Sequence, residues 1–513
     1  MLHITTTDNN CAKNLSELID NSQENDDFSL SHYTELSQIA NISLSELCEK
    51  NKNLIVFPEN ATKTFGSIDD EKIFEMSGNI DCRVNLSAYR QEPDNDANQI
   101  SSQNIKIKTG NLMGFIGSGS TQIQITSRFA DVVSIGSTSK NDFFLHYMLS
   151  KVLCPNLFDL KFDAFSNIKN QFDYLCFLFP HFLKNAMKQG IFKTYQKFEH
   201  NDANVRGTIN VPHHIAKNIP FAGKVAYTER THTYDNFLTQ LVRHTIEVIK
   251  TKPFGKAILS DKNTKSLVSQ IMEITPSYNF FEHEKIIFKN AKSLSHPFFT
   301  EWKKLQKLCL AILKNQKVNF HAESKEVYGI LFDGAWLWEE YLATVLKPLG
   351  FLHPENKEGR GGLHFFDNEV DEEKFDKNYR KIYPDFYRKD LKVNLSAGRQ
   401  ESDNDTNNDN RISILDAKYK HLENGARCED LYQVVSYIHT MSKSCENVLN
   451  GGFVFPCKSS NFDVTQSPQK PYKLAGLGGE ISVIGFKIPQ NAENFANFCS
   501  EIKTAEEELI KNL

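Results

Sequence analysis

The sequence predicts a multidomain α+β protein. It has a small β-rich N-terminal domain at residues 1–135, a mainly helical middle region at 136–325 and an α/β domain at 326–513. Short strand-like runs with Gly-containing turns gather in the first part. Long amphipathic helical patterns dominate the second, and strand-like and helical runs alternate in the third. A length of 513 residues with 40% hydrophobic residues is enough for several cores.

The N-terminal region predicts a small antiparallel sheet. Strand-like runs occur at residues 104–107, 112–116 and 122–126, after a helix-like pattern at 29–50 and a strand-like run at 54–58. The Gly-Ser-Gly-Ser segment at 117–120 predicts a hairpin turn rather than a phosphate-binding loop, because no helix and no Lys-Ser/Thr pair follows it.

The remaining elements follow from hydrophobic periodicity. In the middle region we expect helices from residue 142 and at 172–188, 234–250, 266–274 and 299–313, with one strand at 205–211. In the last region we expect helices at 333–346 and 430–441, strands at 362–366, 380–387, 411–419, 452–455 and 481–487, and a final amphipathic helix capped by Asn491.

A 16-residue segment occurs twice. Residues 84–99 (VNLSAYRQEPDNDANQ) and 393–408 (VNLSAGRQESDNDTNN) share 12 identical positions within unrelated surroundings. The segment is polar and poor in core residues, so we interpret it as an insertion tolerated in surface loops, with a binding element as the alternative. Without the second copy, the separation between Asp385 and Asp416 falls from 31 residues to 15, which suits a hairpin.

Two acidic residues and one lysine carry the functional interpretation. Asp385 follows a Tyr-Pro pair on one predicted strand, and Asp416 and Lys418 are alternate residues on the next. Alternate residues share one face of a strand, and a hairpin brings Asp385 to the same point. Such a cluster is costly to bury. It suits Mg²⁺-assisted phosphodiester hydrolysis, with Asp385 and Asp416 holding the ion and Lys418 orienting water or stabilising charge.

The flanking helices offer further candidates. Glu339 could supply a third carboxylate, although its neighbour Glu340 is an equal choice. Gln433 shares a helix face with Tyr437 and could hydrogen-bond water or phosphate, or it could be an ordinary half-buried polar residue.

The order of these residues resembles the PD-(D/E)xK nuclease superfamily and, more closely, the McrC family of the McrBC modification-dependent restriction system. The segments that carry the resemblance are Tyr-Pro-Asp385, Leu-Asp416-Ala-Lys418-Tyr-Lys, Asp430-Leu-Tyr-Gln433-Val-Val-Ser-Tyr437 and, upstream, Leu337-Trp338-Glu339-Glu340-Tyr341, Gly114-Phe115-Ile116, Arg206-Gly207 and Asp235-Asn236.

The resemblance implies a PD-(D/E)xK restriction-endonuclease-like C-terminal domain that cleaves DNA with Mg²⁺. It also implies a partner, the GTP-hydrolysing AAA+ ring McrB, which recognises modified cytosine. Residues 1–135 would dock on that ring and stimulate it. The chain has no Walker A motif, so we do not expect it to hydrolyse nucleotide. The alternatives are a catalytically silent adaptor and a stand-alone nuclease.

Composition limits the setting of this activity. The net charge of −5 excludes an overall basic coat but not a local basic channel. The ten cysteines are scattered without zinc-ligand spacing, which favours reduced thiols in the cytoplasm. We expect neither a signal peptide nor a membrane span.

Overall fold

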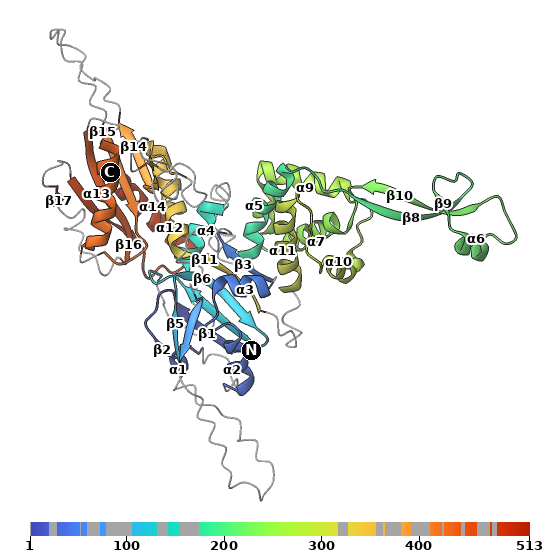
Figure 1. Ribbon diagram of the computed structural model, residues 1–513, viewed down its shortest axis with the longest axis horizontal. Coiled ribbons are helices and arrows are strands. Elements are labelled where there is room, and N and C mark those ends of the chain that lie inside the picture. The colour runs from blue at the N-terminus through green and yellow to red at the C-terminus, as the bar shows by residue number, and fades with distance from the viewer. Residues whose placement is uncertain are drawn as a thin grey trace, which may run out of the picture. The chain divides into compact units, whose positions relative to one another are not determined.

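The computed structural model describes most of the chain as two compact units, Met1–Val152 with Glu323–Leu513, and Leu153–Ala322. Its elements are drawn in Figure 1. The residues that it describes are 2–19, 28–51, 53–58, 72–77, 105–130, 142–153, 174–315, 327–354, 363–364, 381–390, 411–422, 425–442, 447–458, 472–474 and 480–513. Both copies of the repeated segment lie outside these ranges. The fold is multidomain α+β, as the sequence predicts.

The first unit contains a five-stranded sheet with the order β1-β7-β6-β11-β3. Strands β6 and β7 form an antiparallel hairpin whose turn includes Gly119 with a positive φ of 56°, and the predicted hairpin turn is therefore confirmed. The five strands are β1 (Leu2–Thr7), β3 (Asn53–Phe57), β6 (Leu112–Ser118), β7 (Thr121–Thr126) and β11 (Val327–Asp333).

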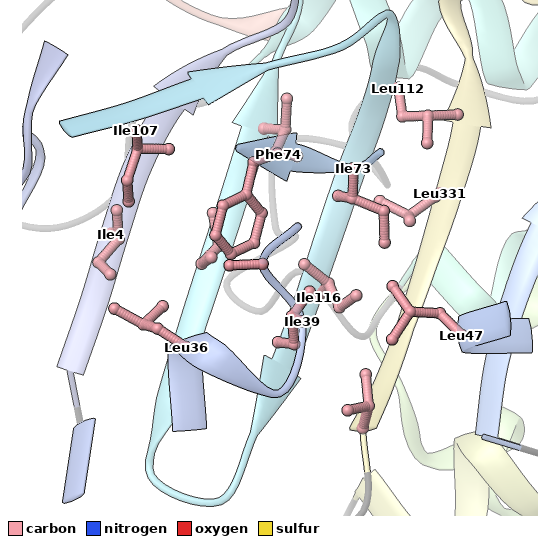
Figure 2. Close-up of a cluster of buried hydrophobic side chains, with 14 of the residues drawn as sticks. Ile4, Leu36, Ile39, Leu47, Ile73, Phe74, Ile107, Leu112, Ile116 and Leu331 are labelled. Carbon is pink, nitrogen blue, oxygen red and sulfur yellow. The ribbon is translucent and has the colours of Figure 1, made fainter. Parts of the chain in front are cut away.

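Helices and a smaller sheet cover one face of this N-terminal sheet. Figure 2 shows Leu36, Ile39 and Leu47 lying over strands that carry Ile116 and Leu331. The covering elements are α1 (Leu15–Leu18), α2 (Leu30–Ser37), α3 (Leu44–Lys50) and the three-stranded sheet of β2 (Lys13–Asn14), β5 (Lys106–Thr109) and β4 (Phe74–Ser77). The predicted helical pattern at 29–50 is thus two helices with a break between them.

Strand β11 corrects the predicted domain boundary at residue 326. It pairs antiparallel with β6 and parallel with β3, so it belongs to the N-terminal sheet. The sequence predicts no strand at 327–333, and a local pattern does not reveal pairing with distant strands, so the predicted boundary places these residues in the following domain. Asp333 then accepts hydrogen bonds from the amides of Ala335 and Trp336 and starts α12 (Gly334–Leu346) directly after β11.

A second five-stranded sheet, β14-β15-β16-β18-β17, forms the C-terminal part of this unit. Strands β14 and β15 are antiparallel, whereas β15, β16 and β18 are parallel. Helix α13 connects β15 to β16 and packs on both. The elements are β14 (Phe386–Asp390), β15 (Arg411–Ala417), α13 (Cys428–Ser442), β16 (Asn447–Lys458), β17 (Tyr472–Lys473), β18 (Glu480–Ile488) and α14 (Phe495–Lys511), with a small pair of strands, β12 (Leu363–His364) and β13 (Lys381–Ile382).

Helix α4 (Phe143–Leu153), from the N-terminal half of the chain, packs against this C-terminal part. Phe144 contacts Trp338 of α12, and Tyr147 contacts Tyr341 of α12. The hydroxyls of Tyr147 and Tyr341 both donate to the carboxylate of Glu506 on α14, at 2.8 and 2.7 Å. Final helix α14 begins after Asn494, which accepts a hydrogen bond from the amide of Asn497, so the cap is Asn494 and not the predicted Asn491.

The second unit combines helices with a long antiparallel ribbon. In Figure 1, β8 and β10 run side by side away from the helices and carry β9 and α6 at their far end. The sequence pattern predicts neither β8 nor β10, because their charged and polar residues do not alternate with apolar ones. The elements are α5 (Tyr174–Lys188), β8 (Thr194–Asp202), β9 (Thr208–Ile209), α6 (Val211–Lys217), β10 (Val225–Thr233), α7 (Phe237–Thr251), α8 (Gly255–Ser260), α9 (Lys262–Ile274), η6 (Phe280–Glu282), α10 (His283–Lys289) and α11 (Thr300–Asn315).

Asp142 connects the end of β7 to the start of α4. Its carboxylate accepts hydrogen bonds from the amides of Ser127 and Leu145, the second at 2.8 Å. Burial raises the pKa of Asp142 from 3.8 to about 7, although these amides oppose the change.

We expect the substitution Asp142→Asn to change how stability depends on pH. The unfolded chain loses the Asp142 proton at lower pH than the folded chain does, so the folded protein loses stability as pH rises from about 4 to about 7. Urea unfolding across this range should show a steeper loss for the parent than for Asp142→Asn. Asp261→Asn, at the half-buried cap of α9, is the matched control. Equal pH dependence in the parent and Asp142→Asn would contradict the expectation.

Candidate active site

The hairpin of β14 and β15 brings the predicted acidic residues together. Asp385 immediately precedes β14, Asp416 lies in β15, and Phe386 pairs with Leu415. The amide of Ala417 donates a 2.8 Å hydrogen bond to Oδ2 of Asp385. The carboxylate of Asp416 is close enough for its negative charge to raise the pKa of Asp385. Neighbouring strands thus place two acidic groups at one point, in the arrangement expected from the sequence.

Asp416 is more buried than Asp385, with only 1% of its surface exposed. Nζ of Lys418 lies 2.6 Å from Oδ2 of Asp416, so the two side chains form an ion pair. Among the described residues, however, neither carboxylate oxygen of Asp416 receives a well-directed hydrogen bond. A buried carboxylate without directed donors carries a large desolvation cost that one ammonium only partly offsets.

The electrostatics of the site reflect this crowding. Burial, followed by the negative charges of Asp416 and Glu339, raises the pKa of Asp385 well above its usual range. Burial lowers the pKa of Lys418, but the carboxylates of Asp416, Asp385 and Asp430 outweigh it, so the net pKa is raised. Asp385 therefore resists ionisation beside Asp416, and Lys418 stays protonated.

Helix α13 supplies the polar partners of Lys418. Nζ of Lys418 donates to Oε1 of Gln433 at 2.7 Å, and Nε2 of Gln433 donates to the hydroxyl of Tyr437 at 2.6 Å. Asp430, one turn earlier, lies 3.9 Å from Nζ of Lys418 and 2.6 Å from Nζ of Lys420. The predicted pairing of Gln433 with Tyr437 on one helix face is confirmed, and this face holds the Lys418 ammonium.

Of the two neighbouring glutamates, Glu339 faces the acidic pair. Its side chain is 14% exposed and its charge acts on Asp385, whereas Glu340 is 37% exposed. Both carboxylates approach Nε2 of His353, at 3.8 Å for Glu339 and 3.7 Å for Glu340. The structure therefore distinguishes two residues that the sequence leaves equivalent.

His353 is a site residue that sequence reasoning missed. Its Nδ1 donates a 2.8 Å hydrogen bond to the main-chain oxygen of Asp385, and its ring stacks on Phe386 with centroids 4.9 Å apart. It thus joins the residues around Glu339 to the strand start that carries Asp385. A single histidine after a helix has no motif or spacing that would identify it, and only the fold brings it to this place.

The donor set fits a divalent cation that prefers oxygen ligands. Asp416 offers two buried oxygens without directed hydrogen bonds, and Asp385 adds a carboxyl group whose ionisation a cation would favour. Within the described residues, no group of three or more His, Cys, Asp or Glu is arranged to hold a metal ion, so Glu339 does not complete a three-residue ligand group. Mg²⁺ commonly takes only one or two protein carboxylates and completes its shell with water and phosphate oxygens.

The comparisons with known proteins agree with the motifs. The family model described as "McrBC 5-methylcytosine restriction system component" matches residues 107–449, two-thirds of the chain. No curated protein matches in sequence. None of the described helices has the length and hydropathy needed to cross a membrane.

Two solved structures from Thermococcus gammatolerans are similar at low levels. The first is a half-complex from a tetradecameric assembly of McrB AAA+ hexamers with bound McrC, with 15% identity, a TM-score of 0.43, and coverage of 98% of this chain and 99% of that chain. The second is the McrBC complex, with 13% identity, a TM-score of 0.30, and coverage of 67% and 87%. Family membership rests on the sequence match, which covers the acidic pair, Lys418 and Gln433. The chain belongs to the family of McrBC 5-methylcytosine restriction system components.

Proposed function

We propose that this chain is the Mg²⁺-dependent DNA endonuclease subunit of a McrBC-like restriction system in the cytoplasm. The observation that carries the proposal is the buried carboxylate of Asp416, without directed hydrogen bonds, between Asp385 and the ammonium of Lys418. A cluster of this kind has no evident structural benefit, since it crowds like charges in a buried place. Its composition suits hydrolysis of a phosphodiester bond.

Each site residue has a part in this proposal. Asp385 and Asp416 would hold Mg²⁺, which when bound lowers the pKa of a water molecule and neutralises charge on phosphate oxygens. Lys418 would stabilise negative charge on the reacting phosphate or orient the attacking water, and Gln433 fixes its ammonium. Glu339 adds negative charge near Asp385.

The proposed partners are DNA and a McrB-like AAA+ GTPase ring, which this chain would stimulate. The family resemblance implies that residues 1–135 dock on the ring. A second surface also favours partner binding, because the far end of the β8–β10 ribbon exposes several apolar side chains and such patches mark interaction sites. These exposed residues are Val205, Ile209, Val211, Ile215, Ile219 and Phe221.

We expect Asp416→Ala and Lys418→Ala to reduce DNA cleavage at least about a hundredfold, because each removes a group that acts on the reacting phosphate. The assay is cleavage of a plasmid containing 5-methylcytosine, with Mg²⁺, GTP and a McrB-like AAA+ GTPase. Lys487→Ala is the matched control, since Lys487 lies on β18, two strands from β15.

The outcomes of this assay separate the rival functions. Variants that cleave like the parent would refute the site. A parent that stimulates GTP hydrolysis but never cleaves DNA would favour a silent adaptor. Cleavage of equal rate without the ring would favour a stand-alone nuclease. Retained stimulation by the inactive variants would separate docking from chemistry.

Asp385→Asn should stabilise the metal-free protein at pH 8, measured as a higher urea midpoint than that of the parent. The raised pKa of Asp385 means that the folded protein loses stability as pH rises, and asparagine removes that loss while keeping an acceptor for the amide of Ala417. Mg²⁺ should raise the melting temperature of the parent and not of this variant. A destabilised variant, or one that still responds to Mg²⁺, would contradict the assignment.

Ile219→Asp and Phe221→Asp should weaken stimulation of the partner's GTPase, because a charge on an apolar contact surface opposes its burial. These side chains are 69% and 67% exposed, so the folded chain should tolerate the changes. Phe281→Asp, at an even more exposed position of the same unit, is the control. Unchanged GTPase stimulation would leave docking to residues 1–135 and refute a contact at the ribbon end.

A further inference from the structure

Tyr419 follows Lys418 directly and lies in a buried position between two parts of the first unit. Adjacent residues of an extended segment point in opposite directions. While Lys418 contacts Asp416, Tyr419 reaches the N-terminal sheet, and the main-chain amide of Lys418 donates a 3.0 Å hydrogen bond to the carbonyl oxygen of Val454 on β16. Tyr419 therefore connects the candidate catalytic lysine, its neighbour in the chain, to the N-terminal sheet on which its own side chain packs.

The hydroxyl of Tyr419 contacts residues from the N-terminal sheet. Oγ of Ser127, directly after β7, lies 2.7 Å from it, and Sδ of Met113 on β6 lies 3.2 Å from it. The ring meets Phe129 edge-on with centroids 5.1 Å apart, and the guanidinium of Arg128 lies 4.9 Å from the ring centroid. Three consecutive residues, 127–129, therefore surround this one side chain.

Helix α12 also contacts the side chain of Tyr419. A Cβ at Gly334, the first residue of α12, would lie 2.7 Å from Cε1 of Tyr419, so only glycine allows this contact. Because α12 also carries Glu339, the ring of Tyr419 touches the start of a helix that reaches the acidic pair.

Hydrogen bonds to the buried carboxyl groups of Asp8 and Asp142 hold residues 127–129 in place. The guanidinium of Arg128 binds the fully buried carboxylate of Asp8 at 2.6 and 2.9 Å, and the amide of Arg128 donates to the same carboxylate. The amide of Ser127 donates to Asp142. Side chains held by several buried charged hydrogen bonds have little freedom to move, so residues 127–129 form a rigid support.

We propose that Tyr419 is a positioning residue for the candidate nuclease site, and that Ser127 and its neighbours in the N-terminal sheet hold Lys418 in place through it. The inference rests on the proposed function for its catalytic consequence, but the mechanical contact is independent of it. The N-terminal sheet then helps to position a candidate catalytic residue of the C-terminal domain.

The first test is a double-mutant cycle in DNA cleavage with the full chain, the AAA+ partner, GTP and Mg²⁺. Tyr419→Phe and Ser127→Ala each remove one side of the same hydrogen bond. We expect each to slow cleavage at saturating DNA about tenfold, because small displacements of a reacting group are costly. The DNA concentration for half-maximal rate should not change, and the double variant should be no slower than the slower single variant.

The second test does not depend on cleavage. Hydrogen exchange of the peptide containing residues 415–422 reports on the Lys418 amide and its bond to Val454. We expect faster exchange in Tyr419→Phe and in Ser127→Ala. Tyr147→Phe is the matched control, because it removes a buried hydroxyl that binds Glu506 elsewhere in the same unit. It should leave both exchange of this peptide and cleavage by the folded protein unchanged.

The results distinguish failure of the inference from failure of the proposed function. Parental exchange in both Tyr419→Phe and Ser127→Ala overturns the inference, whether or not the chain cleaves DNA. So does a double variant whose loss of rate is the product of the two single losses. If exchange responds as expected but Lys418→Ala cleaves like the parent, the contact stands and the nuclease assignment falls.

Discussion

Two carboxyl groups at one buried point are the constraint around which the C-terminal domain is built. Asp385 and Asp416 repel each other, and burial makes the repulsion stronger. The fold offsets it with three groups: the amide of Ala417, the ammonium of Lys418 and, through the main chain of Asp385, the ring of His353. Ala417 and Lys418 lie at the end of β15, and His353 lies in the segment after α12, so the site depends on β14, β15 and that segment being correctly placed together.

The chain from β11 through α12 joins the two sheets of the first unit. Strand β11 belongs to the N-terminal sheet, Asp333 ends it by capping α12, and α12 then packs on the C-terminal domain. Tyr419 makes a second connection a few residues beyond the acidic pair. A chain that crosses between sheets at both α12 and Tyr419 has little scope for independent movement of its two halves. A partner that binds the N-terminal sheet could therefore act on the site through α12 and Tyr419.

The sequence identifies the acidic hairpin because its information is local. Pro-Asp before one strand and Asp-x-Lys at the end of the next lie close in sequence, so a hairpin is the simplest way to bring Asp385, Asp416 and Lys418 together, and Gln433 follows from helical spacing. His353 and the assignment of β11 depend on contacts between distant segments, which no local pattern encodes. The β8–β10 ribbon lacks apolar alternation because much of its surface meets solvent, so the main signal for a strand is absent. The repeated segments lie outside the described residues, and their interpretation as insertions stays a prediction.

The most direct test of the central claim is a crystal structure of the full chain grown with Mn²⁺ in place of Mg²⁺, with anomalous diffraction measured to locate the ion. Mn²⁺ accepts the same oxygen ligands and scatters anomalously. The account predicts one strong anomalous peak bonded to carboxylate oxygens of both Asp385 and Asp416, with Nζ of Lys418 moved away from Asp416. A peak elsewhere, or no peak at this hairpin under saturating Mn²⁺, would contradict it.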